Sequence, residues 1–140
     1  MNNYPNNLLR GISSLEFISK NNIVLAGAFQ FSKNVRDDLF RELSIIWMDN
    51  EAKAFEIAFN QRKSDNKIQF CGGVAILELD QIKHLLKKFI DSKQFCYERR
   101  PLDNNEYHGN LLLSNQIEKQ EEKLICNGLA LISKLEKNIS

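Results

Sequence analysis

The chain has 140 residues, 43% of them hydrophobic, and its 19 Lys and Arg residues nearly balance 18 Asp and Glu residues. This apolar content is enough to bury the core of one domain, and the formal net charge of +1 excludes a protein-wide positive field that would attract nucleic acid or an anionic membrane. No apolar run reaches the roughly 18 residues of a transmembrane helix, and residues 1–7 lack the features of a signal peptide. We therefore expect a single globular domain over residues 1–140, with a polar leader at 1–7, in the cytoplasm and without membrane contact.

Three cysteines, Cys71, Cys96 and Cys126, are odd in number and far apart. This spacing is typical of neither a disulfide framework nor a zinc site. We expect reduced thiols that pack as small buried hydrophobic residues. The scattered carboxylates and two separated histidines predict no metal site, and no motif predicts a cofactor.

The first half of the chain predicts two strands. After the leader, residues 12–18 are ambiguous, whereas the apolar run 23–31 predicts a central strand between polar boundaries. Charged residues 35–42 predict irregular structure or one helical turn. The β-branched and aromatic run 43–48 then predicts a second strand, in which the single tryptophan, Trp47, is expected to pack in the core.

A helix and a long strand are predicted next. Asp49 or Asn50 is expected to cap a helix that runs to about Lys63, because a short side-chain oxygen accepts hydrogen bonds from the free amides of the first turn. Residues 68–79 then predict a strand that contains a pair of glycines. The glycines indicate a bulge or bend rather than a phosphate-binding loop, because strand and not helix follows them.

The following elements are a helix and a strand pair. Asp80 is expected to cap a helix whose apolar stripe extends to Ile90. Residues 95–98 and 107–113 predict two strands that form a hairpin with a long loop.

Asn115 followed by Glu118 is a capping-box pattern, and it predicts a last helix whose apolar positions extend to Leu135. The order of elements predicts an α+β fold in one domain. We expect one mostly antiparallel or mixed sheet of about five strands, with three helices packed mainly on one face.

The segment 97–110 contains the densest cluster of potential contact groups. Its candidate partner-binding residues are Tyr97, Arg99, Arg100, Asp103, Glu106, Tyr107 and His108. Arginine, tyrosine and histidine are typical of protein interfaces, where guanidiniums pair with carboxylates and tyrosines fill shallow pockets. We expect these side chains to be displayed outward together as one docking patch.

The same segment supports two other interpretations. Its arginines and aromatic residues could hold phosphates and stack on bases, as in single-strand binders. His108 is a weak candidate for a general acid or base. A hydrolase would need a pocket that brings His108 within hydrogen-bond reach of Glu98 or Asp103.

Three short patches resemble small uncharacterised bacterial proteins that are encoded near toxin and defence modules. The patches are Glu-Leu-Ser-Ile-Ile-Trp at 42–47, Gly-Val-Ala at 73–75, and residues 100–110. The related pattern is a Leu-Ser-hydrophobic-x-Trp strand before a late Pro…Asn-Pro-x-His-Ala/Gly segment, in which this chain has Glu106 at the second proline. The resemblance implies an accessory of a bacterial conflict system, for which immunity to a partner toxin is one role, rather than a known reaction.

The lead hypothesis is a non-enzymatic protein-binding module, acting as an immunity or antitoxin-like inhibitor of a toxin or defence-complex protein. The alternative, from another class, is an RNA- or nucleotide-binding protein that uses Arg99, Arg100 and His108 at a phosphate. The apolar second half of the last helix, which includes Gly128, would also permit a homodimer.

Overall fold

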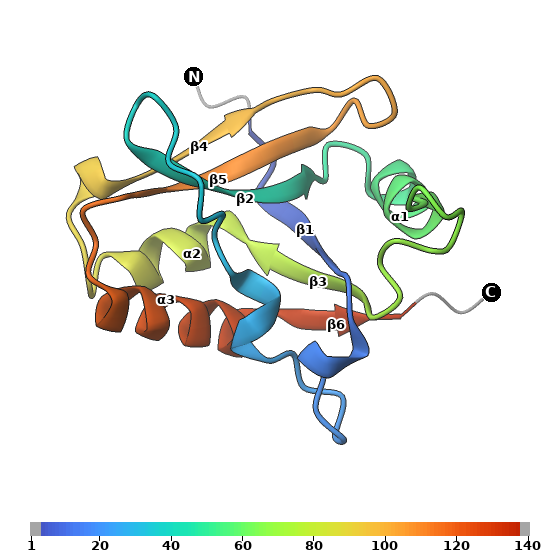
Figure 1. The fold of residues 1–140 in the computed structure, drawn as a ribbon, viewed down its shortest axis with the longest axis horizontal. Coiled ribbons are helices and arrows are strands. Elements are labelled where there is room, and N and C mark those ends of the chain that lie inside the picture. Colours follow the sequence, from blue (N-terminus) through green and yellow to red (C-terminus); the bar gives the residue numbers. More distant parts are fainter. Residues whose placement is uncertain (1–3, 138–140) are drawn as a thin grey trace.

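The computed structural model describes residues 4–137 and shows a six-stranded antiparallel sheet with three α-helices (Figure 1). The strands are β1 (Asn7–Ile12), β2 (Phe40–Trp47), β3 (Gly73–Glu78), β4 (Phe95–Arg99), β5 (His108–Ser114) and β6 (Lys134–Glu136). The α-helices are α1 (Glu51–Asn60), α2 (Leu79–Leu86) and α3 (Lys119–Ile132), and the short 3-10 helices are η1 (Leu15–Phe17), η2 (Ala26–Phe29) and η3 (Ser92–Gln94). The predicted single α+β domain is confirmed, with one more strand than expected.

The strand order is β4-β5-β2-β1-β3-β6, with every pair antiparallel. β1 pairs with β2 only at Leu8 and Leu9, so the two strands separate beyond that point. Arg10 bridges this opening, because its Nε donates to the Ala28 carbonyl and its Nη1 to the Ser44 carbonyl, both at 2.9 Å. Burial lowers the pKa of the Arg10 guanidinium to about 10.

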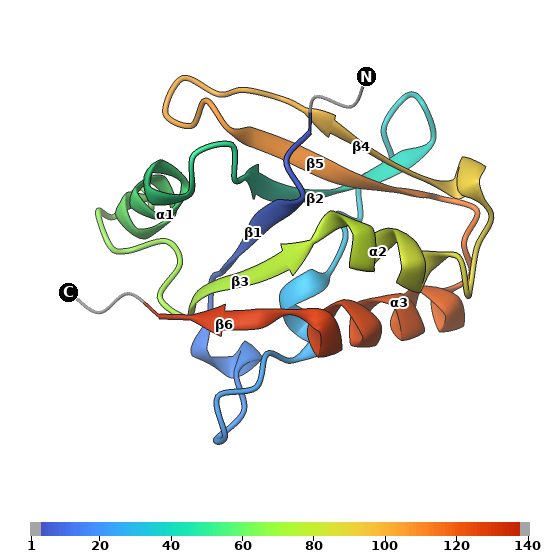
Figure 2. The same ribbon diagram turned by 180° about the vertical axis from the view of Figure 1, so that it is seen from behind.

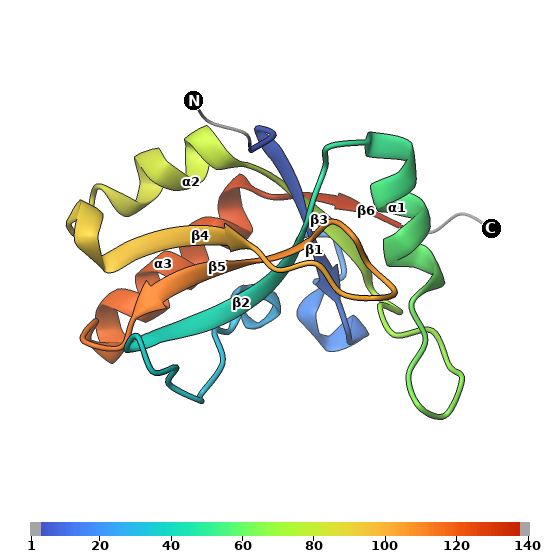
Figure 3. The same cartoon turned by 90° about the horizontal axis from the view of Figure 1, so that it is seen from above.

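The main core lies on one face of the sheet, under α2, α3 and η2 (Figure 2). From β2 this face receives Leu43, Ile45 and Trp47, which alternate along the strand as a pleated backbone requires. A smaller core on the other face joins Leu9 and Ile46 to the buried alanines of α1, which lies at the opposite end of the molecule from α2 (Figure 3). The helices are therefore packed mainly on one face, as predicted, and Trp47 is a core residue.

The central strand was predicted in the wrong place. Residues 23–31 form an isolated bridge at Val24 and then η2, because Ala28 and Phe29 are buried on the same side against the core rather than alternating between two faces. The central strand is β1, with Leu8, Leu9 and Ile12 fully buried. It begins at the end of the predicted leader, whose residues 1–3 lie outside the described range.

α1 begins where the sequence predicts. The Asn50 side chain caps it by accepting a hydrogen bond from the Lys53 amide at 3.1 Å. The helix ends at Asn60 rather than near Lys63, because the next residue, Gln61, has extended backbone angles.

β3 and α2 differ from the expectation in four respects. β3 is shorter than the predicted strand 68–79, since Gly73 has a left-handed φ of 91° at its start. Leu79 already belongs to α2, its amide donating to the Asn6 carbonyl at 2.6 Å. Glu78 therefore holds the N-cap position, Asp80 lies in the first turn instead of capping, and the helix ends at Leu86 before the predicted stripe is complete.

Three further boundaries are corrected. β2 begins at Phe40, so the last part of the segment 35–42 is strand rather than irregular. Glu118 itself is the N-cap of α3, so the capping box, which needs Asn115 at that position, is wrong. α3 ends at Ile132, and Leu135 pairs with Ala75 as part of β6.

Candidate polar contact site

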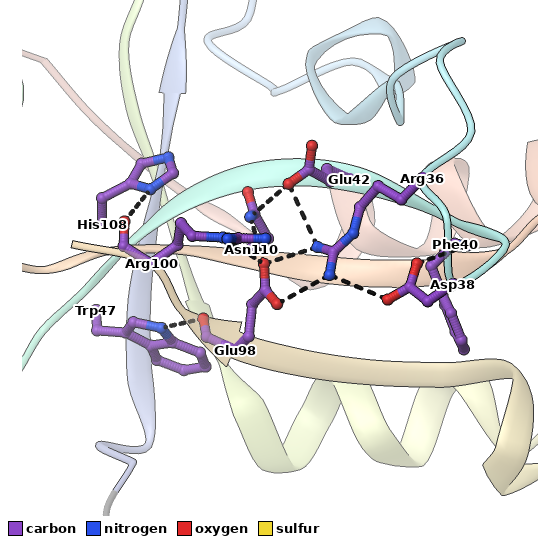
Figure 4. A network of polar contacts seen from close by, with 9 residues as sticks. All are labelled: Arg36, Asp38, Phe40, Glu42, Trp47, Glu98, Arg100, His108 and Asn110. Carbon is purple, nitrogen blue, oxygen red and sulfur yellow. Dashed lines mark hydrogen bonds and ion pairs between the residues drawn. The ribbon is translucent and has the colours of Figure 1, made fainter. Parts of the chain in front are cut away.

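A network of charged and polar side chains crosses β4, β5 and β2 on the face opposite the main core (Figure 4). Glu98 of β4 lies opposite Asn110 of β5, which in turn lies opposite Ser44 of β2. We define the polar network as Arg36, Asp38, Glu42, Glu98 and Asn110, with Arg100 and His108 as its rim.

Arg36 enters the network from the loop before β2. Its amide donates to the Phe40 carbonyl at 2.9 Å, and Leu39 closes this turn with a left-handed φ of 67°. The guanidinium reaches Glu98 in a bidentate contact, Nη1 to Oε2 at 2.7 Å and Nη2 to Oε1 at 3.2 Å. Two charge-assisted bonds between planar groups fix both position and orientation.

Asn110 connects the two carboxylates of the network. Its Nδ2 donates to Glu42 Oε2 and to Glu98 Oε2, each at 2.8 Å, and the residue is 2% exposed. Arg36 also reaches Glu42 at 3.4 Å and Asp38 at 3.0 Å. Every charged member is thus held by at least one other member.

The electrostatics keep the central pair ionised. Burial by itself would raise the pKa of the Glu98 carboxyl, but hydrogen bonds from Arg36 and Asn110 outweigh it and hold this pKa below its ordinary value. The hydrogen bond to Glu98 is the main cause that raises the pKa of Arg36. The pair therefore stays charged throughout the physiological pH range.

The rim is more open than the centre. The Arg100 side chain is 57% exposed, and its Nε lies 3.4 Å from Glu98 Oε2. The Nδ1 atom of His108 lies 2.8 Å from the Arg100 carbonyl oxygen. The three carboxylates and two guanidiniums of this surface leave it negative by one charge.

The seven sequence-predicted contact residues do not form one outward surface. Tyr97 packs against the core, with its ring 5.8 Å from Trp47 and 4.9 Å from Tyr4, and Tyr107 packs against both cores. Their predicted outward display is therefore wrong: Tyr97 shares a sheet face with the main core, and Tyr107 fills the space between the two cores.

The charged members of the predicted set also separate. Arg99 donates to both oxygens of Asp49, at 2.9 and 2.7 Å, and lies over the Tyr4 ring. Glu106 pairs with Lys53 of α1 at 2.6 Å. Asp103 is exposed in the turn before β5, so the structure brings only Arg100 and His108 together beside the polar network.

The geometry around His108 bears on the acid–base interpretation. Within residues 4–137, the hydrogen-bond partner of its Nδ1 is the Arg100 carbonyl, whereas Glu98 is engaged by Arg36 and Asn110. His108 and the two carboxylates named for a hydrolase therefore do not form a hydrogen-bonded group in this part of the chain. In the same range, no group of three or more His, Cys, Asp and Glu side chains is placed to hold a metal ion.

Sequence reasoning missed most of the polar network. Asn110 could have been found, because it is a polar residue directly before the apolar run 111–113. A polar residue inside a predicted strand indicates that its side chain has polar neighbours on that face of the sheet. Arg36 carried no such signal, since its partner Glu98 is 62 residues away in the chain.

The cysteines are only partly as predicted. All three are free, but Cys71 and Cys96 are exposed rather than buried. Cys126 is buried, its Sγ lies 3.1 Å from the Phe29 carbonyl, and burial raises the pKa of its thiol. Cys96 is exposed because it lies on the edge strand β4, on the face away from the main core.

None of the helices formed by residues 4–137 is long and apolar enough to span a membrane. No protein-family model matches the chain, and no curated protein or solved structure matches it. The likeness to immunity proteins therefore stays a prediction from the sequence.

Proposed function

We propose that the chain is a non-enzymatic protein-binding module whose contact surface is the polar network with its rim. The observation that supports this proposal is the bidentate Arg36–Glu98 pair, in which Glu98 also accepts a hydrogen bond from Asn110. Side chains that are ordered before binding lose less conformational entropy when a partner docks. A surface held in this way favours recognition of one complementary partner.

The charge of the surface favours a cationic partner protein. The side chains of Asp38 and Glu42 are 48% and 37% exposed, so their carboxylates can accept further hydrogen bonds from a partner. Complementary charge speeds encounter and excludes wrong partners more than it raises affinity. We therefore propose that lysine and arginine side chains of the partner meet these two carboxylates.

The same geometry gives the nucleic-acid alternative less support. Arg99 is held by Asp49, and Arg100 lies against Glu98, so both predicted phosphate ligands already face a carboxylate. A phosphate at this surface would also approach three network carboxylates, and like charges repel.

We assign the biological setting from the sequence resemblance. An immunity or antitoxin-like inhibitor needs a stable scaffold with one preformed surface for its toxin, which agrees with the arrangement of the polar network. The three free thiols agree with a reducing cytoplasm, where we place the protein.

The proposal is tested by affinity capture from the native host, followed by mass spectrometry. Asp38→Asn with Glu42→Gln removes the two accessible charges while keeping side-chain size. Glu16→Gln with Asp80→Asn is the matched control, since it removes two exposed charges elsewhere. We expect the wild type and the control to retain the same partner, and the network variant to bind the purified partner at least about tenfold more weakly.

Equal capture by the network variant and the wild type would contradict the proposal. So would a chain that captures no protein but binds RNA or DNA at low salt, with an affinity that falls steeply as salt rises. The second outcome would establish the alternative function.

A further inference from the structure

A groove of about 1040 Å³ runs along α3, between this helix and residues 26–33. It lies on the opposite face of the sheet from the polar network: Arg41 lines it, and the next residue, Glu42, belongs to the network. In Figure 1, η2 lies beside α3, and the chain leaves η2 toward the loop that precedes β2. We propose that this groove binds an extended acidic peptide segment that carries an apolar side chain.

The rim of the groove is cationic. Lys33, Lys119 and Lys123 line it and are exposed. The remaining charged residues of the lining, Arg41 and Glu122, form an ion pair and neutralise each other. The charged side chains of the described lining therefore sum to +3 in a nearly neutral protein, and they favour an anionic ligand.

Arg41 provides a second, independent indication. Its Nε atom is buried and, among the described residues, has no hydrogen-bond partner. A buried donor without an acceptor is unfavourable, because it has lost its hydrogen bond to water. Because Arg41 lines the groove, a carboxylate ligand there would lie near this unpartnered donor, which adds to the preference for an anion.

The floor is apolar and the sides carry carboxamides. Phe31, Ile117 and Cys126 are buried at the base, where one apolar ligand side chain would be shielded from water. Gln30, Asn115, Gln120 and Asn127 are exposed along the sides. A carboxamide both donates and accepts hydrogen bonds, which matches the alternating N–H and C=O groups of a peptide backbone.

The length of the groove sets the length of the ligand. From Lys119 to Asn127, α3 advances about 12 Å at 1.5 Å per residue. An extended peptide covers that distance with about four residues at 3.3 Å each. A single-stranded nucleic acid would instead need several aromatic faces on which successive bases stack, and the described lining of the groove contains one aromatic residue, Phe31.

This inference does not rest on the proposed function. The polar network is negative and lies on one face of the sheet, whereas the groove is positive and lies on the other. The two surfaces could therefore be occupied at the same time, and each has its own test.

The test is a titration of the full chain, ¹⁵N-labelled, with short capped peptides observed by NMR. The probe has a central leucine with two glutamates on each side. One comparison peptide replaces the glutamates by glutamines, and a second replaces the leucine by serine. We expect the acidic leucine peptide to shift the amide signals of residues 30–33 and 119–127, and to bind at least about tenfold more tightly than either comparison peptide.

Two triple variants distinguish binding by the lysines of the groove from a general effect of the protein's net charge. Lys33→Gln, Lys119→Gln and Lys123→Gln together should weaken the acidic leucine peptide at least about tenfold. Lys20→Gln, Lys87→Gln and Lys88→Gln together change the net charge equally at exposed sites outside the lining, and should leave binding within about twofold. Unchanged amide dispersion in both triple variants would show that they are folded.

Several outcomes would overturn the proposal: equal weakening in both triple variants, equal binding of the glutamine peptide, or shifts confined to the polar network. If an RNA oligonucleotide shifted the same amide signals and bound more tightly than the peptide, the proposed ligand of the groove would be a nucleic acid instead. Affinity capture with the Asp38 and Glu42 variant reads out the proposed function separately, so failure of one test is distinguishable from failure of the other.

Discussion

The two faces of the β4–β5 hairpin differ in composition, although successive residues of the same two strands alternate between them. On one face the partly buried rings of Tyr97 and Tyr4 pack against the fully buried Trp47. On the other face Glu98, the next residue, holds Arg36. The faces meet at Glu98, whose backbone carbonyl accepts a hydrogen bond from Trp47 Nε1 at 3.1 Å while its side chain belongs to the polar network.

This contrast separates stability from recognition. Apolar area removed from water stabilises the fold by about 25 cal/mol per Å², so the aromatic face carries the larger contribution. A half-buried ion pair gains little net energy, because desolvation of the charges offsets their attraction. The polar face is therefore better explained by the geometry it presents to a partner than by the stability it adds.

The largest effect is expected on the aromatic face. Trp47 is fully buried, so Trp47→Ala should leave a cavity beside Tyr4 and Tyr97 and lower the free energy of unfolding by about 3–5 kcal/mol. Urea denaturation followed by far-UV circular dichroism measures this loss. A loss below about 1 kcal/mol would mean that the aromatic face does not carry the stability assigned to it.

Gly109 tests how closely the two faces are joined. A Cβ atom there would collide with the Trp47 indole nitrogen and the Glu98 carbonyl oxygen, which hydrogen-bond to each other across the glycine. We expect Gly109→Ala to cost about 2–3 kcal/mol, since the backbone of β4 cannot yield easily.

Gly128→Ala is the matched control for this substitution. Its new Cβ would meet the flexible end of Leu85, and alanine favours a helix interior by up to about 1 kcal/mol over glycine. The control should therefore change the unfolding midpoint much less. Similar losses in both variants would show that the Trp47–Glu98 contact is not the cause.

How far the fold was predictable depends on how local each signal is. The β4–β5 hairpin, β2 and the start of α1 follow from strand composition and from the Asn50 cap, which act between near neighbours in sequence. β1 was missed because Arg10 and Gly11 interrupt its apolar residues. The run 23–31 was misassigned because a short apolar segment without alternation fits a strand and a buried 3-10 turn equally well.

The site was predictable only on the hairpin. Pairing of the two strands puts Arg100 and His108 near each other, and both had been selected from the sequence. Whether Tyr97 faces outward depends on which face of the sheet the helices cover. The residue pattern of a single strand does not determine that. Arg36 reaches the site through the tertiary fold alone, and its proximity to Glu98 could not be read from the sequence.

The polar face should respond to acid. Since the pKa of Glu98 is lower in the folded chain than its ordinary value of about 4.3, its contribution is complete above that value and is lost as pH falls through the folded pKa. Glu98→Gln should lower the free energy of unfolding by about 1–2 kcal/mol at pH 7 and remove this part of the acid dependence. Urea titrations at pH 7, 5, 4 and 3 measure both effects. Parallel pH curves for the two proteins would contradict the assignment.

The smallest effects on stability are expected at two arginines of the hairpin, Arg100 of the rim and Arg99 over Tyr4, and these two should behave differently. Arg100→Ala removes an exposed side chain with one long ion-pair contact, so the free energy of unfolding should change by no more than about 0.5 kcal/mol. Arg99→Ala removes the bidentate contact with Asp49 and the packing over Tyr4, and should cost about 1 kcal/mol. Partner capture should not fall in the Arg100 variant, because loss of this cation makes the surface more negative and the proposed partner is cationic. If the Arg99 variant lost the partner while it remained folded, the contact would lie on the Tyr4 side of the hairpin, and the partner surface would have to be moved there from the Glu98 side.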